Sequence, residues 1–415
     1  MEAQRPIRVL DAVKWGEEIE RAFFARGGRE LPPITVDYYH THSLHFDPYT
    51  KIEELNGIER DVVRRLGEDD AVGQILARMC REYRAVVWML ARRGTPGFCK
   101  MSEQLYGSAG DCVHPESPCL VEVGRRMAVL LDGSHHEGSR EGRARDLGAP
   151  RAADLLTARL NRYFQDPAVV HVRISDGILA DAAAGCDYIK IRSTARFTAQ
   201  DLRLLEVHEG WVHLATTING QRQPFCTFLG KGTPSSTVTQ EGLAVLTELL
   251  ASASYPQRLR RLCHRVEAIA RAEAGADFLE VYRFYLDEGY APRACYQHTV
   301  RVFRGSLPSG CGPFTKDLCY AKGFVQVCEH VRRAVECANS AKVTLLFCGK
   351  TMLAELPVLA QLVDDGLVVP PRYVPPTFAD ARRLAARMHF FPDFPTPANG
   401  PVESSMPSGQ RPSRS

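Results

Sequence analysis

The sequence lacks any long apolar segment. No apolar run reaches the roughly eighteen residues that a membrane-spanning helix requires. Residues 1–15 carry charges throughout, so they also lack the apolar centre of a secretory signal peptide. We therefore expect a cytoplasmic protein that has no membrane as a partner.

The sequence also has little net charge. It holds 52 lysines and arginines against 49 aspartates and glutamates, a formal net charge of +3. Because nucleic-acid-binding domains usually carry a concentrated basic face, we expect no nucleic acid as a partner. Apolar residues make up 45% of the 415 residues, which excludes global disorder and provides for a large core. Nothing in the sequence indicates an oligomeric state.

The 13 cysteines form no C-x-x-C pair. This absence excludes a zinc ribbon and a thioredoxin-like motif. Disulfide scaffolds occur mainly in short secreted chains, so we interpret the thiols as small buried residues in a reducing compartment.

Hydrophobic periodicity predicts a mostly helical chain with a small β component. Helices are expected within residues 1–30, from residue 52, at 71–93, 118–131, 151–164 and 198–219, from 240 onward, and at 353–362. Short runs rich in β-branched residues predict strands at 169–174, 188–191, 299–303 and 343–348.

The strongest candidate for chemistry is HEGWVH at residues 208–213, an H-E-x-x-x-H motif. Thr198, with Asp201 three residues later, predicts the N-cap of a helix that carries it. Two imidazoles and one further ligand can hold a zinc ion and leave a position open for water. The carboxylate beside the first histidine can then act as a general base. The alternative is a buried helix with ordinary core histidines.

The spacing is one residue longer than in the familiar H-E-x-x-H helix. Residues five apart differ by about 140° around a regular helix, which would point His213 away from His208. A single π-bulge absorbs one residue, and Gly210 is the position where the backbone adopts it most readily. Both histidines can bind one metal only if the helix carries such a bulge; an undistorted helix would instead pair Glu209 with His213.

The segment TQEGLA at residues 239–244 supplies a candidate third ligand. We expect Glu241 to open the next helix, which folds back beside the motif after a loop rich in Gly, Pro, Ser and Thr. A carboxylate on a neighbouring helix is the usual third ligand of such sites. The helix dipole also favours a carboxylate in a first turn, so simple capping is the alternative.

These segments resemble the QEGLA-motif family. The resemblance is carried by LEVHEGWVH (205–213), QPFCTFLGKG (223–232), TQEGLA (239–244), LHFDPYTKIEEL (44–55), RGTPGFCKMSEQLYG (93–107), IKIRSTARFTAQDL (189–202) and VFRGSLPSGCGPFTKDLCYAKGF (302–324), and it covers residues 34–376. The bacterial members are named for an effect on flavohemoglobin expression. Their eukaryotic relatives include the microtubule-associated tyrosine carboxypeptidases, which remove the C-terminal tyrosine of α-tubulin.

The resemblance implies that His208, His213 and Glu241 bind zinc (Zn²⁺) and that Glu209 is catalytic. It implies an α+β fold, mostly α, with a zincin-like metallopeptidase core of the gluzincin type, an H-E-x-x-x-H helix and a small β-sheet. The chain departs from the tubulin-cleaving relatives at residues 210–212, GWV, where smaller residues are expected. This departure leaves the ligands intact and would narrow the pocket beside the metal.

A carboxypeptidase also needs a cation for the terminal carboxylate of its substrate. Arg304 and Lys316, in the C-terminal resembling segment, are our candidates ahead of Arg196 and Arg293, although each can equally be a solvated or paired residue. Tyr320 lies four residues after Lys316, so it can share a helix face with it and donate to the oxyanion. A core tyrosine is the alternative.

Three other patterns carry less weight. His40, His42 and His45 alternate on a segment that we expect to be extended, so they would point to opposite faces. The segment GKT at 349–351 resembles the end of a P-loop, but the first glycine of that motif is missing, which excludes a nucleotide site. The basic run RLRRLCHR at 258–265 predicts a solvated helix face, on which an acidic protein tail could dock.

The sequence therefore predicts a zinc-dependent metallopeptidase that hydrolyses a peptide bond at a protein or peptide C-terminus. Two alternatives stay open: a zinc hydrolase of a small amide or modified peptide in a biosynthetic pathway, and a non-catalytic regulatory binding protein. The expected parts are an N-terminal helical segment (1–33), a helical N-terminal subdomain (34–150), a zinc metallopeptidase catalytic core (151–376), a C-terminal helix (377–391) and a disordered tail (392–415).

Overall fold

The computed structural model describes residues 7–115, 117–132, 146–166, 170–176, 178, 181–337 and 339–389. Of the segments predicted from sequence, the tail at 392–415 lies entirely outside them. Within the described part, no helix combines the length and the apolar character that a membrane span requires.

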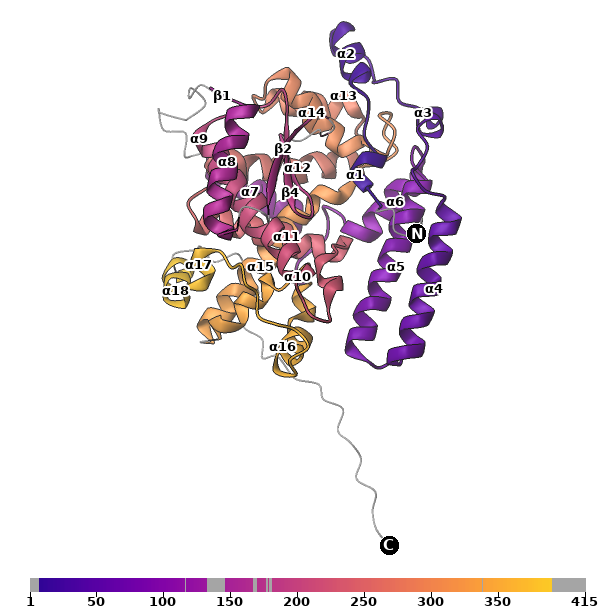
Figure 1. The fold of residues 1–415 in the computed structure, drawn as a ribbon. Helices are drawn as coiled ribbons and strands as arrows, with labels where there is room; N and C mark the ends of the chain where they lie inside the picture. Colours follow the sequence, from indigo (N-terminus) through magenta and orange to yellow (C-terminus); the bar gives the residue numbers. More distant parts are fainter. Residues whose placement is uncertain are drawn as a thin grey trace.

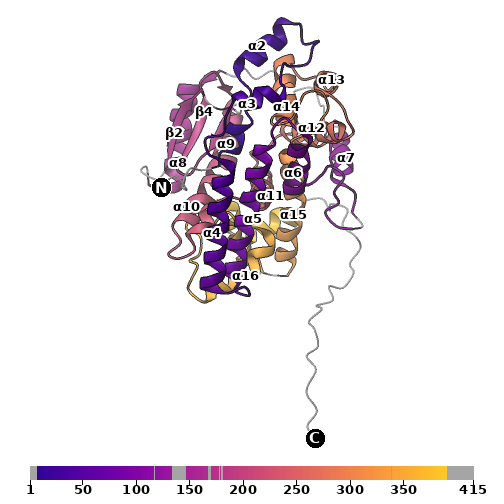
Figure 2. The same cartoon turned by 90° about the vertical axis from the view of Figure 1, so that its right-hand side faces the viewer.

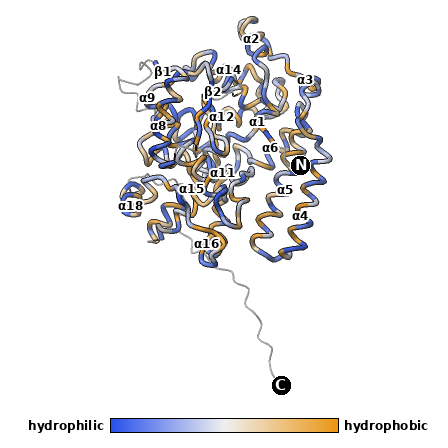
Figure 3. The backbone as a smooth tube through the Cα atoms, viewed as in Figure 1, coloured by the Kyte–Doolittle hydropathy of each residue, from blue (hydrophilic) through white to orange (hydrophobic). Residues whose placement is uncertain are grey.

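The N-terminal part consists of helices, of which α4 and α5 lie side by side along one side of the molecule (Figures 1 and 2). Asp47 caps α4 by accepting from the Thr50 N–H at 2.8 Å, and Asp70 caps α5 by accepting from the Gly73 N–H at 2.7 Å. Hydrophilic and hydrophobic residues alternate along both helices, as Figure 3 shows, so one face of each is available for packing. The helices are α1 (Val9–Ala12), α2 (Glu17–Ala25), α3 (Val36–Thr41), α4 (Pro48–Leu66), α5 (Ala71–Ala91), α6 (Pro96–Tyr106) and α7 (Leu120–Asp132).

A small sheet follows, packed beside α8 (Ala149–Phe164). Its strand order is β2-β4-β3, with β2 parallel and β3 antiparallel to β4, so β3 is an edge strand. The strands are β2 (His171–Ser175), β3 (Ala182–Ala184) and β4 (Tyr188–Arg192), and a separate two-stranded pair joins β1 (Leu147–Gly148) to β5 (Arg196–Phe197). The strand predicted at 188–191 is confirmed, and the one at 169–174 is shifted towards the C-terminus. The edge strand was not predicted, because its three alanines carry no β-branched signal.

The rest of the chain is helical and surrounds a central pair, α11 and α15 (Figure 1). Its elements are α9 (Ala199–Leu205), the π helix η3 (Glu206–Leu214), α10 (Ala215–Gln221), α11 (Pro234–Leu250), α12 (Pro256–Glu273), α13 (Phe278–Asp287), α14 (Pro292–Phe303), α15 (Leu318–Glu336), α16 (Leu356–Asp364), α17 (Pro376–Ala379) and α18 (Ala381–His389). Short 3₁₀ turns lie at Thr227–Gly230, Thr315–Asp317, Ser340–Phe347 and Leu353–Glu355. The predicted fold class, mostly α with a small sheet, is confirmed.

Two predicted strands are wrong. The segment 299–303 belongs to α14, and 343–348 lies mainly in the 3₁₀ turn Ser340–Phe347. Pro292 occupies the first turn of α14, and the Thr299 hydroxyl donates to the Cys295 carbonyl at 2.8 Å, one turn back along the helix. Because both segments are buried on the core side, packing overrides the β preference of their branched residues.

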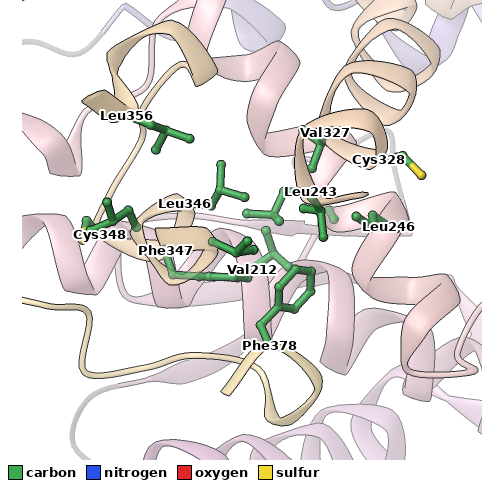
Figure 4. Close-up of a cluster of buried hydrophobic side chains, with 14 of the residues drawn as sticks. Val212, Leu243, Leu246, Val327, Cys328, Leu346, Phe347, Cys348, Leu356 and Phe378 are labelled. Carbon is green, nitrogen blue, oxygen red and sulfur yellow. The ribbon is translucent and has the colours of Figure 1, made fainter. Parts of the chain in front are cut away.

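The main hydrophobic cluster holds the π helix against the central pair of helices (Figure 4). Val212 of η3 is fully buried in this cluster with Leu243 and Leu246 of α11 and Val327 of α15. One face of the π helix is therefore fixed by the core.

The α11 and α15 backbones touch where two glycines meet. A Cβ atom placed on Gly242 would lie 2.1 Å from the backbone carbonyl of Gly323. No other residue type allows this approach without moving a helix. Close packing of the two helices therefore explains the glycine in the TQEGLA segment.

Candidate metal centre

The H-E-x-x-x-H motif lies on a continuous helix whose middle is a π helix. The predicted N-cap is confirmed: Thr198 and Asp201 form a reciprocal capping box at the start of α9. From Glu206 to Leu214 the hydrogen bonding is of the π type, which brings residues five apart onto one face. The distortion that joint ligation by the two histidines requires is therefore present, and it extends over nine residues rather than a single bulge. A Cβ atom on Gly210 would lie 2.4 Å from Leu160, so the glycine also lets η3 approach α8.

The π helix brings the two histidines together, and α11 adds a glutamate. The Nε2 atoms of His208 and His213 are 3.2 Å apart, and each lies 3.4 Å from Oε2 of Glu241. The expectation that Glu241 opens its helix is wrong, because α11 begins at Pro234 after an N-cap at Thr233. Glu241 therefore lies two turns inside the helix. At that depth the helix dipole no longer stabilises a carboxylate, so simple capping does not explain this residue.

These three atoms fit a single metal ion. Tetrahedral coordination with bonds of about 2.0–2.1 Å places ligand atoms about 3.3–3.4 Å apart. Oε2 of Glu241 is buried and has no hydrogen-bond partner among the described residues, which is the state expected of an oxygen that receives a cation. Burial alone would raise the pKa of Glu241, but His213, His208 and Lys316 outweigh it and hold that pKa well below the usual value. The cluster can hold a metal ion.

A second carboxylate orients the first histidine. Oε1 of Glu248 lies 2.6 Å from Nδ1 of His208, and Glu248 is fully buried. Arg258 donates a hydrogen bond to the same carboxylate at 3.1 Å. The Ser254 hydroxyl donates to it as well, at 3.2 Å. Such a partner on the far nitrogen fixes the ring and its tautomer and directs Nε2 towards the metal position.

Glu248 and His208 strongly affect each other's ionisation. Burial opposes protonation of His208, but the carboxylates of Glu241 and Glu248 raise the pKa of His208 to about 10 in the metal-free protein. Burial opposes ionisation of Glu248, but Arg258 and His208 lower its pKa to about 2. Sequence reasoning missed Glu248; its only signal is that it follows Glu241 by seven residues, two turns along the same helix face.

Glu209 is held by the sheet. The backbone N–H of Ala184, on the edge strand β3, donates to Oε2 of Glu209 at 2.9 Å. The alternative in which an undistorted helix pairs Glu209 with His213 therefore does not hold. This hydrogen bond holds one oxygen of the Glu209 carboxylate, which lies next to the candidate metal cluster.

Tyr320 and Lys316 lie beside the cluster. Tyr320 is on α15, and Lys316 is in the 3₁₀ turn just before that helix. The ring of Tyr320 stacks near that of His208, with centroids 6.4 Å apart. Burial and the nearby Glu241 carboxylate raise the pKa of Tyr320. Lys316 is close enough to lower the pKa of Glu241.

Arg304 lies in a buried group of arginines around one carboxylate. Asp317 accepts from Arg301 at 2.6 and 2.9 Å, while Arg265 and Arg304 lie 3.7 and 4.0 Å from it. The Nε atoms of Arg265 and Arg304 are buried without a hydrogen-bond partner among the described residues. Burial and the neighbouring Arg301 lower the pKa of Arg304 to about 10, which leaves it charged at neutral pH. Three guanidinium groups thus face one carboxylate, and this excess positive charge lies next to Tyr320.

The basic run on α12 contributes to this group, so its interpretation as a solvated face is wrong. The side chains of Arg258 and Arg265 are only 12% exposed, because they turn towards carboxylates on α11 and on the 3₁₀ turn before α15. Sequence spacing could not reveal those partners.

The other candidates lie away from the cluster. Arg196 donates to a backbone carbonyl of residue 146, and Arg293 is paired with Glu20 on the surface. Trp211 packs in a buried cluster, where its ring stacks on Tyr163 with centroids 5.4 Å apart. A separate pocket of about 850 Å³ lies between α6, α11 and α15, and none of the residues considered for chemistry lines it.

The histidines at 40, 42 and 45 were expected on an extended segment, which is wrong for the first two. His40 belongs to α3, and the ring of His42 stacks on Tyr38. Among the described residues, the only group that meets the geometric requirements of a metal site is His208, His213 and Glu241.

A comparison with known protein families identifies relatives of this chain. A family model described as microtubule-associated tyrosine carboxypeptidase matches residues 21–394, a span that includes every residue of the cluster. No curated protein matches the chain significantly. The family match confirms the relation to these carboxypeptidases that the sequence resemblance implied. The chain belongs to the microtubule-associated tyrosine carboxypeptidase family.

Proposed function

We propose that this protein is a zinc-dependent metallopeptidase with a zincin-like core, which removes a residue from the C-terminus of a protein or peptide. The observation that carries the proposal is the triangle of His208, His213 and Glu241, in which the facing oxygen of Glu241 accepts no hydrogen bond from the described residues. Two imidazoles and a carboxylate are a donor set that suits zinc and leave a fourth position open. Membership of a carboxypeptidase family supports the reaction class.

Glu209 is the proposed general base. When bound, zinc would supply a polarised substrate carbonyl and a water whose pKa is lowered towards ~7. The Ala184 N–H holds Oε2 of Glu209, so Oε1 is the atom that would take the proton and return it to the leaving amine. Tyr320, beside His208, would donate its hydroxyl hydrogen to the developing oxyanion.

The cations near the cluster suit the C-terminal carboxylate of the substrate. Arg304 and Lys316 are our candidates for the terminal carboxylate of the substrate, and Arg265 adds positive charge to the same region. A carboxylate that arrives there would satisfy guanidinium groups that now share the single carboxylate of Asp317. We place the chain with the QEGLA-named members on its motifs, and C-terminal tyrosine is the first residue to test because of the family's name.

The test is a peptide panel with free or amidated C-termini, including tyrosine-ended peptides, assayed with the metal-loaded wild type and Glu209→Gln. We expect release of the last residue from free peptides only, and loss of turnover in Glu209→Gln with its metal content unchanged. Cleavage of amides would favour the small-amide hydrolase. Unchanged biological function of Glu209→Gln, with no cleavage by wild type, would favour the regulatory protein.

A further inference from the structure

The segment that resembles an incomplete P-loop lies directly behind the metal cluster. Nζ of Lys350 donates to the backbone carbonyl of His213 at 2.9 Å and to the side-chain carbonyl of Gln240 at 3.0 Å. Gln240 immediately precedes Glu241 on α11. One ammonium group therefore links the π helix, which carries the two histidines, to the helix that carries the glutamate.

Further hydrogen bonds close this link into a ring. The Thr216 hydroxyl donates to Gln240 at 2.7 Å, and the Gln240 amide donates to the Gly349 carbonyl at 3.3 Å. The Thr217 hydroxyl donates to the same His213 carbonyl at 2.8 Å. These donors lie where the helix returns from π-type to α-type hydrogen bonding. At this point the spacing between each backbone carbonyl and its N–H donor changes.

The position of Lys350 is set by close backbone packing. Its own N–H donates to the Leu229 carbonyl at 2.6 Å, and a Cβ atom on Gly349 would lie 2.5 Å from that oxygen. Glycine at 349 is therefore required for the lysine to reach the cluster. Burial lowers the pKa of Lys350 to about 8, whereas the carboxylates of Glu241 and Glu209 favour its charged form.

We propose that Lys350 is a positioning residue, which holds His213 and Glu241 at metal-binding distance by bridging the π helix and α11. Its ammonium acts through the His213 carbonyl and Gln240, not through the ligand atoms themselves. This role rests on the proposed metal centre. It also explains why a GKT segment occurs in a chain without a P-loop.

The test measures metal affinity on the full chain after removal of metal by a chelator. Wild type, Lys350→Met, Lys350→Arg and Lys231→Met are titrated with Co²⁺, and the visible absorption of the bound ion reports its coordination geometry. Lys350→Met keeps the apolar stem and removes the donor; we expect affinity about 10–100-fold weaker and an altered spectrum, as for other partners behind metal ligands. Lys350→Arg, which keeps a charged donor, should recover part of the loss. The exposed Lys231→Met should match wild type.

Each outcome bears on the proposal. Affinity and spectrum of Lys350→Met equal to wild type would overturn the positioning role and leave the metal centre standing. Absence of Co²⁺ binding by wild type would overturn the proposed function, and the role of Lys350 with it. If the metal-free Lys350→Met does not unfold cooperatively, Lys350→Gln replaces it, and equal affinities of the Gln and Arg variants would count against the proposal.

Discussion

Replacing Gly242 by alanine tests the contact that places Glu241. The added Cβ would lie 2.1 Å from the Gly323 carbonyl, against about 3.4 Å for ordinary contact, so α11 and α15 would have to separate by about 1.3 Å. Overpacking of this kind costs typically about 1–3 kcal/mol, and we expect the upper end because both partners are backbone. The better helix propensity of alanine returns about 1 kcal/mol, which leaves a net loss of about 2 kcal/mol.

The matched control is Gly57→Ala on α4. Gly57 is also helical, but a Cβ atom there would meet only the end of the Arg60 side chain, at 4.0 Å. We expect this variant to gain about 0.5–1 kcal/mol, the opposite sign, because alanine restricts the unfolded chain. Urea unfolding of both metal-free variants gives the two free energies. If Gly242→Ala is as stable as Gly57→Ala, the two backbones do not touch and the reasoning is refuted.

Three further outcomes are expected. Asp317→Asn should destabilise the fold by about 3–5 kcal/mol in urea unfolding, because it leaves buried Arg301 without its carboxylate; a loss below about 1 kcal/mol would mean that water already solvates the arginines. The pKa of Glu248 is lowered to about 2, so the folded protein binds fewer protons than the unfolded chain between about pH 4.5 and 2. The ionised Glu248 carboxylate therefore contributes fully to stability above that window, and this contribution is lost as the pH falls through it. Unfolding of Glu248→Gln across this range should show a flatter acid limb than wild type, and an unchanged slope would contradict the pairing. Thr198→Ala should cost about 1 kcal/mol by loss of the N-cap while metal content stays the same; an unchanged free energy of unfolding would show that the capping box adds nothing.

The candidate metal cluster was the most predictable part of the molecule because its signal is local. The five-residue spacing of His208 and His213 forces a choice between separated side chains and a π-type distortion, and the structure has the distortion. Glu241 was found by its segment, but the start of its helix was missed. Thr233, Pro234 and Ser236 already carry the N-cap and first-turn signals that would have corrected the boundary.

The residues behind the cluster could not be predicted in the same way. Glu248, Arg258 and Lys350 come from different elements, and only the folded chain brings them to the ligands. In the sequence, a basic run and an incomplete P-loop have ordinary local explanations. Their roles become visible only from the buried partners that the fold brings to them. The strand predicted at 299–303 failed for a related reason, because burial against neighbouring helices outweighs local β preference.

Metal content is the most direct test of the central claim. Wild type, His208→Ala and Glu241→Ala would be purified under the same conditions, and zinc per chain measured by plasma mass spectrometry. We predict about one zinc per chain in wild type and its loss in both variants, since each removes one of three protein ligands. Wild type without zinc after reconstitution, or zinc retained in Glu241→Ala, would contradict the site as described.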